Sequence, residues 1–160
     1  MNVLDTIIEF KRQEVAKKKT FYPEELFKND FFFDAETISL KENLLADGAS
    51  GIIAEFKRKS PSKGDINASA NIGQVTQGYR LAGASGLSVL TDKRFFGGEN
   101  DDVTKTRRLN RFPVLRKDFI IDKYQITEAK AIGASVILLI AAVLSQKEIQ
   151  DLTEYAKTLN

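Results

Sequence analysis

The chain has 160 residues, of which 42% are hydrophobic and 29% are charged, and its formal net charge is +2, as in an ordinary domain with a core of its own. Because it contains neither cysteine nor histidine, the sequence excludes disulfides, thiolate nucleophiles, histidine-based triads and metal sites built on these residues. Acid–base chemistry must therefore use Glu, Asp, Lys or Tyr, and the small net charge gives no indication of a nucleic-acid partner.

No targeting or membrane segment is recognisable in the sequence. The first residues lack a signal-peptide pattern, and the apolar stretch at 136–144 is long enough only for a strand and its exit. The sequence therefore favours a soluble, cytoplasmic protein without a membrane partner.

Residues 1–48 are predicted to form a helical extension. Apolar residues recur there at helical spacing, namely Leu4, Ile7, Ile8 and Val15. The lysines at 17–19 fit a solvated helix end, where cations suit the helix dipole. The aromatic residues between 21 and 33 are expected to dock the extension on the main body rather than to form a ligand site.

Residues 49–160 alternate between short apolar runs and helical patterns. The apolar runs lie at 52–54, 87–90, 114–115 and 136–140, and the helical patterns at 72–81, 101–109, 124–131 and 146–159. None of the runs shows clean polar alternation, so each is predicted to be a strand buried on both faces. Ser145 and Glu148 form a capping box at the start of the last helix. The alternation predicts an α/β fold in which the strands form a contiguous parallel sheet in chain order.

Charged residues stand at the carboxyl ends of two of these predicted strands. Glu55 and Lys57 follow the first run, and they share a face because they are two residues apart; Lys117 ends the third in an equivalent position. Ligands bind at this edge of parallel sheets, so these residues are candidates for catalysis, with a structural ion-pair network as the alternative. Phe96 and Phe119 lie just beyond strand ends, where they could hold an aromatic substrate or belong to the core.

The segments that carry these residues form a distinctive series. They read Glu-Phe-Lys-Arg-Lys-Ser-Pro-Ser at 55–62, Ser-Val-Leu-Thr-Asp at 88–92, Phe-Phe-Gly-Gly at 95–98 and Val-Leu-Arg-Lys-Asp-Phe-Ile-Ile-Asp at 114–122, with Tyr-Gln-Ile at 124–126 and Leu-Leu-Ile-Ala-Ala at 138–142. In order and spacing the series resembles the indole-3-glycerol phosphate synthases of tryptophan biosynthesis. Each motif alone is weakly specific, whereas the combination is highly specific.

The resemblance implies a (β/α)8 TIM barrel with an amino-terminal helical extension. It also implies a lyase that converts 1-(2-carboxyphenylamino)-1-deoxyribulose 5-phosphate into indole-3-glycerol phosphate, carbon dioxide and water, without a cofactor or metal. The expected partner is therefore a small, phosphorylated aromatic substrate.

Roles for individual residues follow from the same resemblance. Lys117 is the expected general acid, which protonates the substrate carbonyl during ring closure. Lys57 is expected to hold the anthranilate carboxylate or the phosphate and to protonate the departing hydroxyl. Glu55 orients Lys57 and takes part in dehydration, while Ser60 contacts the carboxylate. The residues expected to pack on the aromatic ring are Phe96, Phe119 and Leu138.

Only four βα units follow the extension, whereas the family barrel has eight and about 250 residues. We therefore expect a half-barrel that lacks the family's general-base glutamate and phosphate-binding loops and is inactive alone. Without an opposite wall, its inward residues would drive self-association; they are predicted to include Ile53, Leu90, Leu115 and Leu139.

Two other interpretations stay open. The first is a non-catalytic half-barrel that self-associates or complements a separate half. The second is another phosphate-binding barrel, such as the isomerase of the same pathway, which the segment at 55–62 disfavours.

Overall fold

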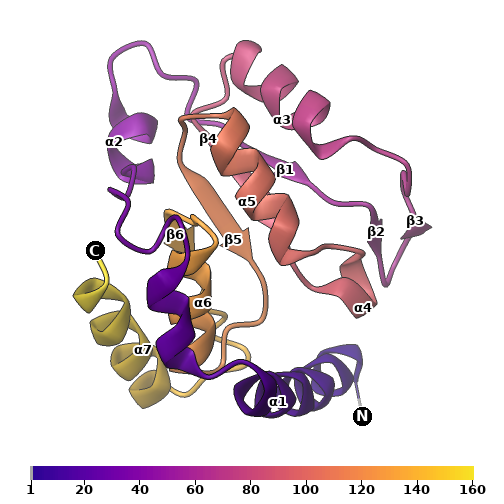
Figure 1. Ribbon diagram of the computed structural model, residues 1–160. Helices are drawn as coiled ribbons and strands as arrows, with labels where there is room; N and C mark the ends of the chain where they lie inside the picture. Colours follow the sequence, from indigo (N-terminus) through magenta and orange to yellow (C-terminus); the bar gives the residue numbers. More distant parts are fainter. Residues whose placement is uncertain (1) are drawn as a thin grey trace.

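Four parallel strands organise residues 2–160, which are the residues that the computed structural model describes. They lie side by side in the order β1 (Ile53–Phe56), β4 (Gly86–Leu90), β5 (Val114–Lys117) and β6 (Val136–Ile137) (Figure 1). In the register, Ser88 lies opposite both Glu55 and Leu115, and Leu90 lies opposite Lys117. The predicted contiguous parallel sheet is thus confirmed. Within the described residues it forms half of a barrel and does not close.

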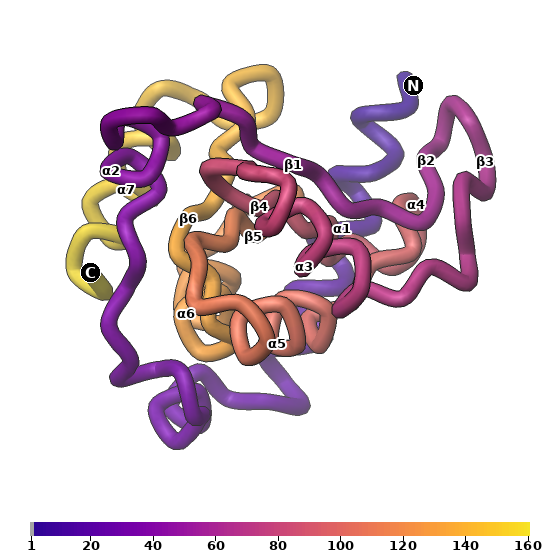
Figure 2. Tube along the Cα trace, turned by 90° about the horizontal axis from the view of Figure 1, so that it is seen from above, coloured from indigo at the N-terminus to yellow at the C-terminus, as the bar shows by residue number. Residues whose placement is uncertain are grey.

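Helices alternate with the strands as the sequence predicts. The predicted helices are α3 (Ile72–Leu81), α5 (Asn100–Leu109), α6 (Lys123–Ala131) and α7 (Gln146–Thr158), whereas the short helix α4 (Lys93–Phe96) after β4 was not predicted. Side chains fix several helix starts: Asn71 accepts a hydrogen bond from the amide of Gln74, and Ser145 and Glu148 form the predicted capping box. Seen from above, α3, α5 and α6 follow one another along one side of the curved sheet (Figure 2).

One face of the sheet carries the apolar core, and we call it the helix-covered face. The buried residues gathered there are Phe56, Ile72, Val89, Val103 and Val114. Because strand side chains alternate, the register places Glu55, Ser88 and Lys117 on the opposite face, which we call the inner face.

The prediction that every strand is buried on both faces is wrong for three of the four. Only β4 is buried throughout, whereas β5 alternates between buried and half-buried residues and both residues of β6 are half-buried. Ile53 in β1 is 40% exposed. The reason is that β1 and β6 are edge strands, and that no second layer covers the inner face as fully as the helices cover the other within residues 2–160.

The fourth predicted strand, at 136–140, is also shorter than expected. Only Val136 and Ile137 pair with β5. The prediction that Leu139 points inward is wrong, because its side chain packs beside Ile137 in a cluster between α6 and α7. The buried members of this cluster are Ile120, Ile126, Leu144 and Leu152. Because the run at 136–140 contains no polar residue, the sequence does not show which side of the sheet Leu139 faces.

The extension consists of α1 (Val3–Phe21), the 3-10 helix η1 (Glu24–Asn29) and α2 (Leu40–Leu45). Phe27 of η1 and Val15 of α1 pack against Tyr124 of α6, so part of the aromatic segment docks the extension as expected. Phe21 and Phe31 do not, since they are 75% and 78% exposed. Among residues 2–160, no helix combines the length and apolar character needed to cross a membrane.

A small hairpin, which the sequence patterns did not predict, follows β1. Its strands are β2 (Lys59–Ser60) and β3 (Gly64–Asp65), which pair antiparallel. The backbone amide of Ile66 closes it by donating to the carbonyl of Arg58 at 2.8 Å. The hairpin therefore holds Ser60 beside the carboxyl end of β1.

Candidate active site

A single carboxylate joins two lysines on the inner face, at the carboxyl edge of the sheet. Glu55 Oε1 accepts a hydrogen bond from Lys57 Nζ at 2.8 Å, and Glu55 Oε2 accepts one from Lys117 Nζ at 2.7 Å. Ser88, on the strand between them, donates to Glu55 Oε2 at 3.4 Å. The side chain of Glu55 is 25% exposed and each lysine side chain 39%. Three residues that the sequence singled out therefore meet at one place, and their roles stay predictions.

The electrostatics of this group favour an anionic ligand. Burial by itself would raise the pKa of Glu55, but hydrogen bonds from Lys117 and Lys57 outweigh it and hold that pKa below its ordinary value. One carboxylate against two ammonium groups leaves a formal surplus of one positive charge. A carboxylate or phosphate could therefore take over either lysine from Glu55.

Lys57 and Ser60 face a pocket of about 690 Å³, which Phe96 also lines. The hairpin forms one wall of this pocket, and Leu4 and Ile7 of α1 contribute apolar surface to it. The pocket thus combines an ammonium and a hydroxyl with apolar walls, as a ligand with a charged group and a ring requires.

The two phenylalanines predicted to hold the ring lie close together. The ring centroids of Phe96 and Phe119 are 6.1 Å apart, with an interplanar angle of 39°, within the range of aromatic pairs. Leu138 follows the end of β6, between Ile137 and Leu139, which both pack in the cluster between α6 and α7. Its contact with an aromatic ring stays a prediction.

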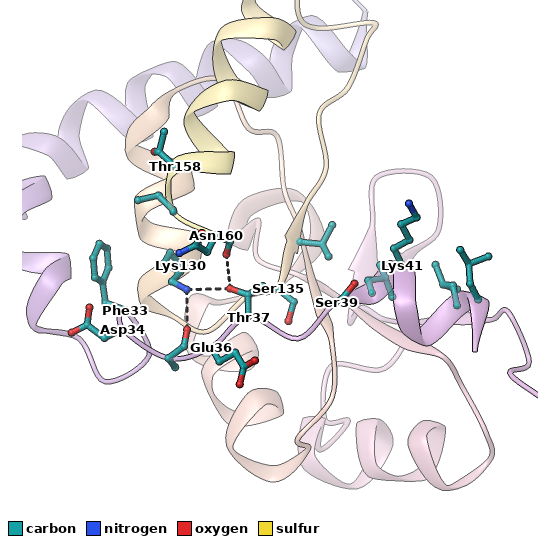
Figure 3. Close-up of a pocket in the computed structure, with 16 residues that line it drawn as sticks. Phe33, Asp34, Glu36, Thr37, Ser39, Lys41, Lys130, Ser135, Thr158 and Asn160 are labelled. Atoms are coloured by element: carbon teal, nitrogen blue, oxygen red, sulfur yellow. Dashed lines mark hydrogen bonds between the residues drawn. The ribbon is translucent and has the colours of Figure 1, made fainter. Parts of the chain in front are cut away.

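A larger cavity than this pocket lies at the other end of the strands. It has a volume of about 1070 Å³ and is lined by Ser135 and Val136, where β6 begins, by residues 158–160, and by residues 33–37, 39–41 and 44–45 (Figure 3). Lys130 points into it and donates to the carbonyl of Ala35 at 2.9 Å and to Thr37 Oγ1 at 3.1 Å. Because this cavity lies at the amino ends of the strands, away from the charged group, we do not assign the chemistry to it.

Sequence reasoning missed a second charged network, on the helix-covered face. Arg116 has a side chain only 1% exposed, and it donates to Glu128 at 2.6 Å and to the carbonyl of Gln125 at 2.8 Å. Asp118 lies 3.4 Å from the same guanidinium and accepts from Thr91 at 2.6 Å. The alternation of side chains along β5 places Arg116 and Lys117 on opposite faces of the sheet. The partners of Arg116, however, depend on tertiary contacts. Arg116 thus belongs to a buried ion-pair network, whereas for Glu55, Lys57 and Lys117 both the catalytic prediction and the ion-pair alternative stay open.

Comparison with known proteins shows similarity along nearly the whole chain. A family model described as indole-3-glycerol phosphate synthase matches residues 4–160. The indole-3-glycerol phosphate synthase of Bacteroides thetaiotaomicron is 46% identical over 158 residues, which cover 99% of this chain and 60% of that protein. The corresponding enzyme of Exiguobacterium sibiricum is 45% identical over 161 residues, covering 98% of this chain and 58% of that protein. The chain spans about 60% of the length of the curated relatives it matches.

Proposed function

The chain belongs to the indole-3-glycerol phosphate synthase family, and from this premise we propose that it supplies the general acid, the anion-binding lysine and the apolar clamp of a decarboxylating ring closure. The proposed substrate is 1-(2-carboxyphenylamino)-1-deoxyribulose 5-phosphate. The observation that carries the proposal is the bridge from Glu55 to Lys57 and Lys117 at the carboxyl edge of the sheet. A location in the cytoplasm stays a prediction.

Lys117 is the proposed general acid for ring closure. A bond forms between the aromatic carbon that bears the carboxylate and the ketone carbon, so negative charge develops on the ketone oxygen. The Lys117 ammonium stabilises that charge and transfers a proton to it. The bond to the carboxylate then breaks, its electron pair restores aromaticity, and carbon dioxide leaves.

Lys57 and Glu55 are proposed to act before and after that step. Lys57 lines the pocket, so its ammonium can leave Glu55 Oε1 and pair with a substrate carboxylate or phosphate. After decarboxylation the hydroxyl formed from the ketone must depart as water. Lys57 is the proposed proton donor, while Glu55, held as an anion, is proposed to orient the lysine and to take part in the proton transfers of dehydration.

Apolar and hydroxyl groups are proposed to hold the reacting carbons near attack distance. The ring pair of Phe96 and Phe119 offers faces on which the anthranilate ring can pack, and Leu138 adds apolar surface. Ser60, which lines the same pocket as Lys57, is proposed to donate a hydrogen bond to the carboxylate. We expect the general base and the phosphate-binding loops from further strands of the family barrel.

The proposal can be tested by turnover in a completed barrel. The chain is combined with the carboxyl-terminal part of the Bacteroides thetaiotaomicron synthase that it does not match, and formation of indole-3-glycerol phosphate is followed. We expect turnover from the combination and none from the chain alone. Lys57→Met should raise KM and lower kcat, each by about 10-fold or more, because a charged contact to the substrate is lost.

The matched control is Lys105→Met, which removes an exposed lysine of α5 that pairs with Asp101. This variant should turn over normally. An active completed barrel in which Lys57→Met behaves like Lys105→Met would refute the role of Lys57.

A second candidate function, a non-catalytic half-barrel that binds a second copy of itself, is favoured by the sheet edges. Among residues 2–160, no strand pairs with the outer edge of β1 or β6. Ile52 and Ile53 on the first edge are 59% and 40% exposed, and residues 133–146 beside the second hold no charged side chain. Exposed apolar edges without a pairing strand promote strand pairing between chains.

Light scattering over a concentration series tests self-association of the chain. We expect dimers or larger species, and a shift toward monomer in Ile53→Lys, because a charge on an edge strand opposes pairing. The control is Leu81→Lys, which places the same charge on α3, at a residue that is 76% exposed and belongs to no strand. A compact monomer at every concentration would contradict self-association.

A further inference from the structure

Lys11 of α1 is buried, although it lies on a surface helix of the extension. Its side chain is 1% exposed, and its ammonium lies 2.9 Å from carboxylate oxygens of Glu14, Asp92 and Asp118. Glu14 belongs to the same helix, whereas Asp92 follows β4 and Asp118 follows β5. One cation therefore ties α1 to the turns after two neighbouring strands, at the edge where the candidate active site lies.

Each of these aspartates also organises the turn in which it stands. Asp92 Oδ1 accepts a hydrogen bond from the amide of Phe95 at 2.7 Å, which starts α4. Asp118 Oδ1 accepts one from the amide of Phe119 at 2.8 Å. The turn after β4 carries Phe96, and the turn after β5 carries Phe119 directly after Lys117. Lys11 thus pairs with one carboxylate in each of the two turns that carry the ring pair, and one of these carboxylates, Asp118, directly follows the proposed general acid.

From this arrangement we propose that Lys11 is a positioning residue for ring closure, which sets the separation of the two turns and so the placement of Lys117, Phe96 and Phe119. It does not touch the pocket itself. Without its charge, Asp92 and Asp118 would face each other in a buried setting and repel. A displacement of about 1 Å at a reacting group can cost about 10²-fold in rate, so a small opening of the turns matters.

A second contact between α1 and α4 supports this bracing role. The rings of Phe10 and Phe95 meet edge-on with centroids 6.0 Å apart, and the guanidinium of Arg94 lies 3.5 Å from the Phe10 ring centroid. The contacts of α1 with the turn after β4 are therefore both ionic and aromatic.

Lys18 provides a matched control on the same helix. Its ammonium pairs with Glu128 of α6 at 3.0 Å and with Glu14 at 3.2 Å, so it helps to dock α1 without touching either turn. A purely structural role for Lys11 predicts that Lys11→Met and Lys18→Met behave alike. The positioning role predicts that only Lys11→Met changes the turns after β4 and β5.

The first measurement is amide hydrogen exchange in the chain as it stands. In Lys11→Met we expect the amides of Phe95 and Phe119 to exchange about tenfold faster or more, beyond any global loss of protection, with no such local change in Lys18→Met. If Lys11→Met does not fold, Lys11→Arg, which keeps the charge but not the compact ammonium, carries the same expectation. Equal exchange at these amides in the Lys11 and Lys18 variants would overturn the proposal.

The second measurement rests on the proposed function and uses the completed barrel. Lys11→Met should lower kcat about 10- to 100-fold while KM changes less than threefold, whereas Lys18→Met keeps kcat within about threefold of the parent. Adding Asp92→Asn to Lys11→Met should restore part of kcat, because one of the two repelling carboxylates becomes neutral. Unchanged kcat in Lys11→Met overturns the positioning role. An inactive parent barrel overturns the proposed function instead, and hydrogen exchange then still decides the role of Lys11.

Discussion

Two adjacent residues of β5, Arg116 and Lys117, belong to charged groups that differ in almost every physical respect. Arg116 faces the helices, is 1% exposed, and is held by Glu128, Asp118 and backbone oxygen. Lys117 faces inward, is 39% exposed, and has Glu55 as its ion-pair partner. A buried cation whose hydrogen-bond donors all have protein partners cannot bind a substrate. A half-exposed cation with one ion-pair partner can exchange that partner for a substrate. Burial and partner number, rather than charge, therefore separate the structural group from the candidate catalytic one.

The largest expected effect on stability comes from the buried group. Arg116→Met should lower the free energy of unfolding by about 3–5 kcal/mol, because Glu128 and Asp118 would stay buried without the guanidinium that pairs with them. Urea unfolding of the chain, followed by circular dichroism, measures the change. A loss of less than about 1 kcal/mol would show that the network is hydrated and would remove the contrast with Lys117.

We expect the same buried network to lose its stabilising effect at low pH, when Asp118 becomes protonated. Burial would raise the pKa of Asp118, but Arg116 and Lys11 hold it at about 2 in the folded chain. A folded pKa below the unfolded value of about 3.9 gives stability that is present above pH 4 and is lost as pH falls toward 2. This contribution is about 2 kcal/mol.

Comparison of pH-dependent unfolding in the parent chain and in Asp118→Asn isolates that contribution. The variant should be less stable at neutral pH and should lose less stability between about pH 4 and pH 2. Parallel curves for the two proteins in that range would contradict the assigned pKa.

The smallest expected effect on stability comes from the inner face. Lys117→Met should change the free energy of unfolding by less than about 1 kcal/mol, because the pair with Glu55 is partly exposed and Lys57 still neutralises the carboxylate. The same urea experiment measures it beside Arg116→Met. Equal losses in the two variants would place both residues in one structural network.

The alternation of side chains along a strand explains which part of this contrast could be predicted from the sequence. Adjacent residues of a strand face opposite ways, so the separation of Arg116 from Lys117 and the meeting of Glu55 with Lys57 follow from spacing alone. The partners of Arg116 and Lys11 do not, because Glu128 and Asp118 reach them only once α6 and α1 have packed. Leu139 was misplaced because the apolar run around it has no polar residue to reveal which face it takes.

The most direct test of the central claim is turnover by Lys117→Met in the completed barrel. With the folded fraction matched to the parent by urea unfolding, we expect kcat to fall by a factor of about 10² to 10⁴, because the proton donor of ring closure is lost while the fold stays intact. Turnover within about threefold of the parent would contradict the assignment of Lys117 as the general acid.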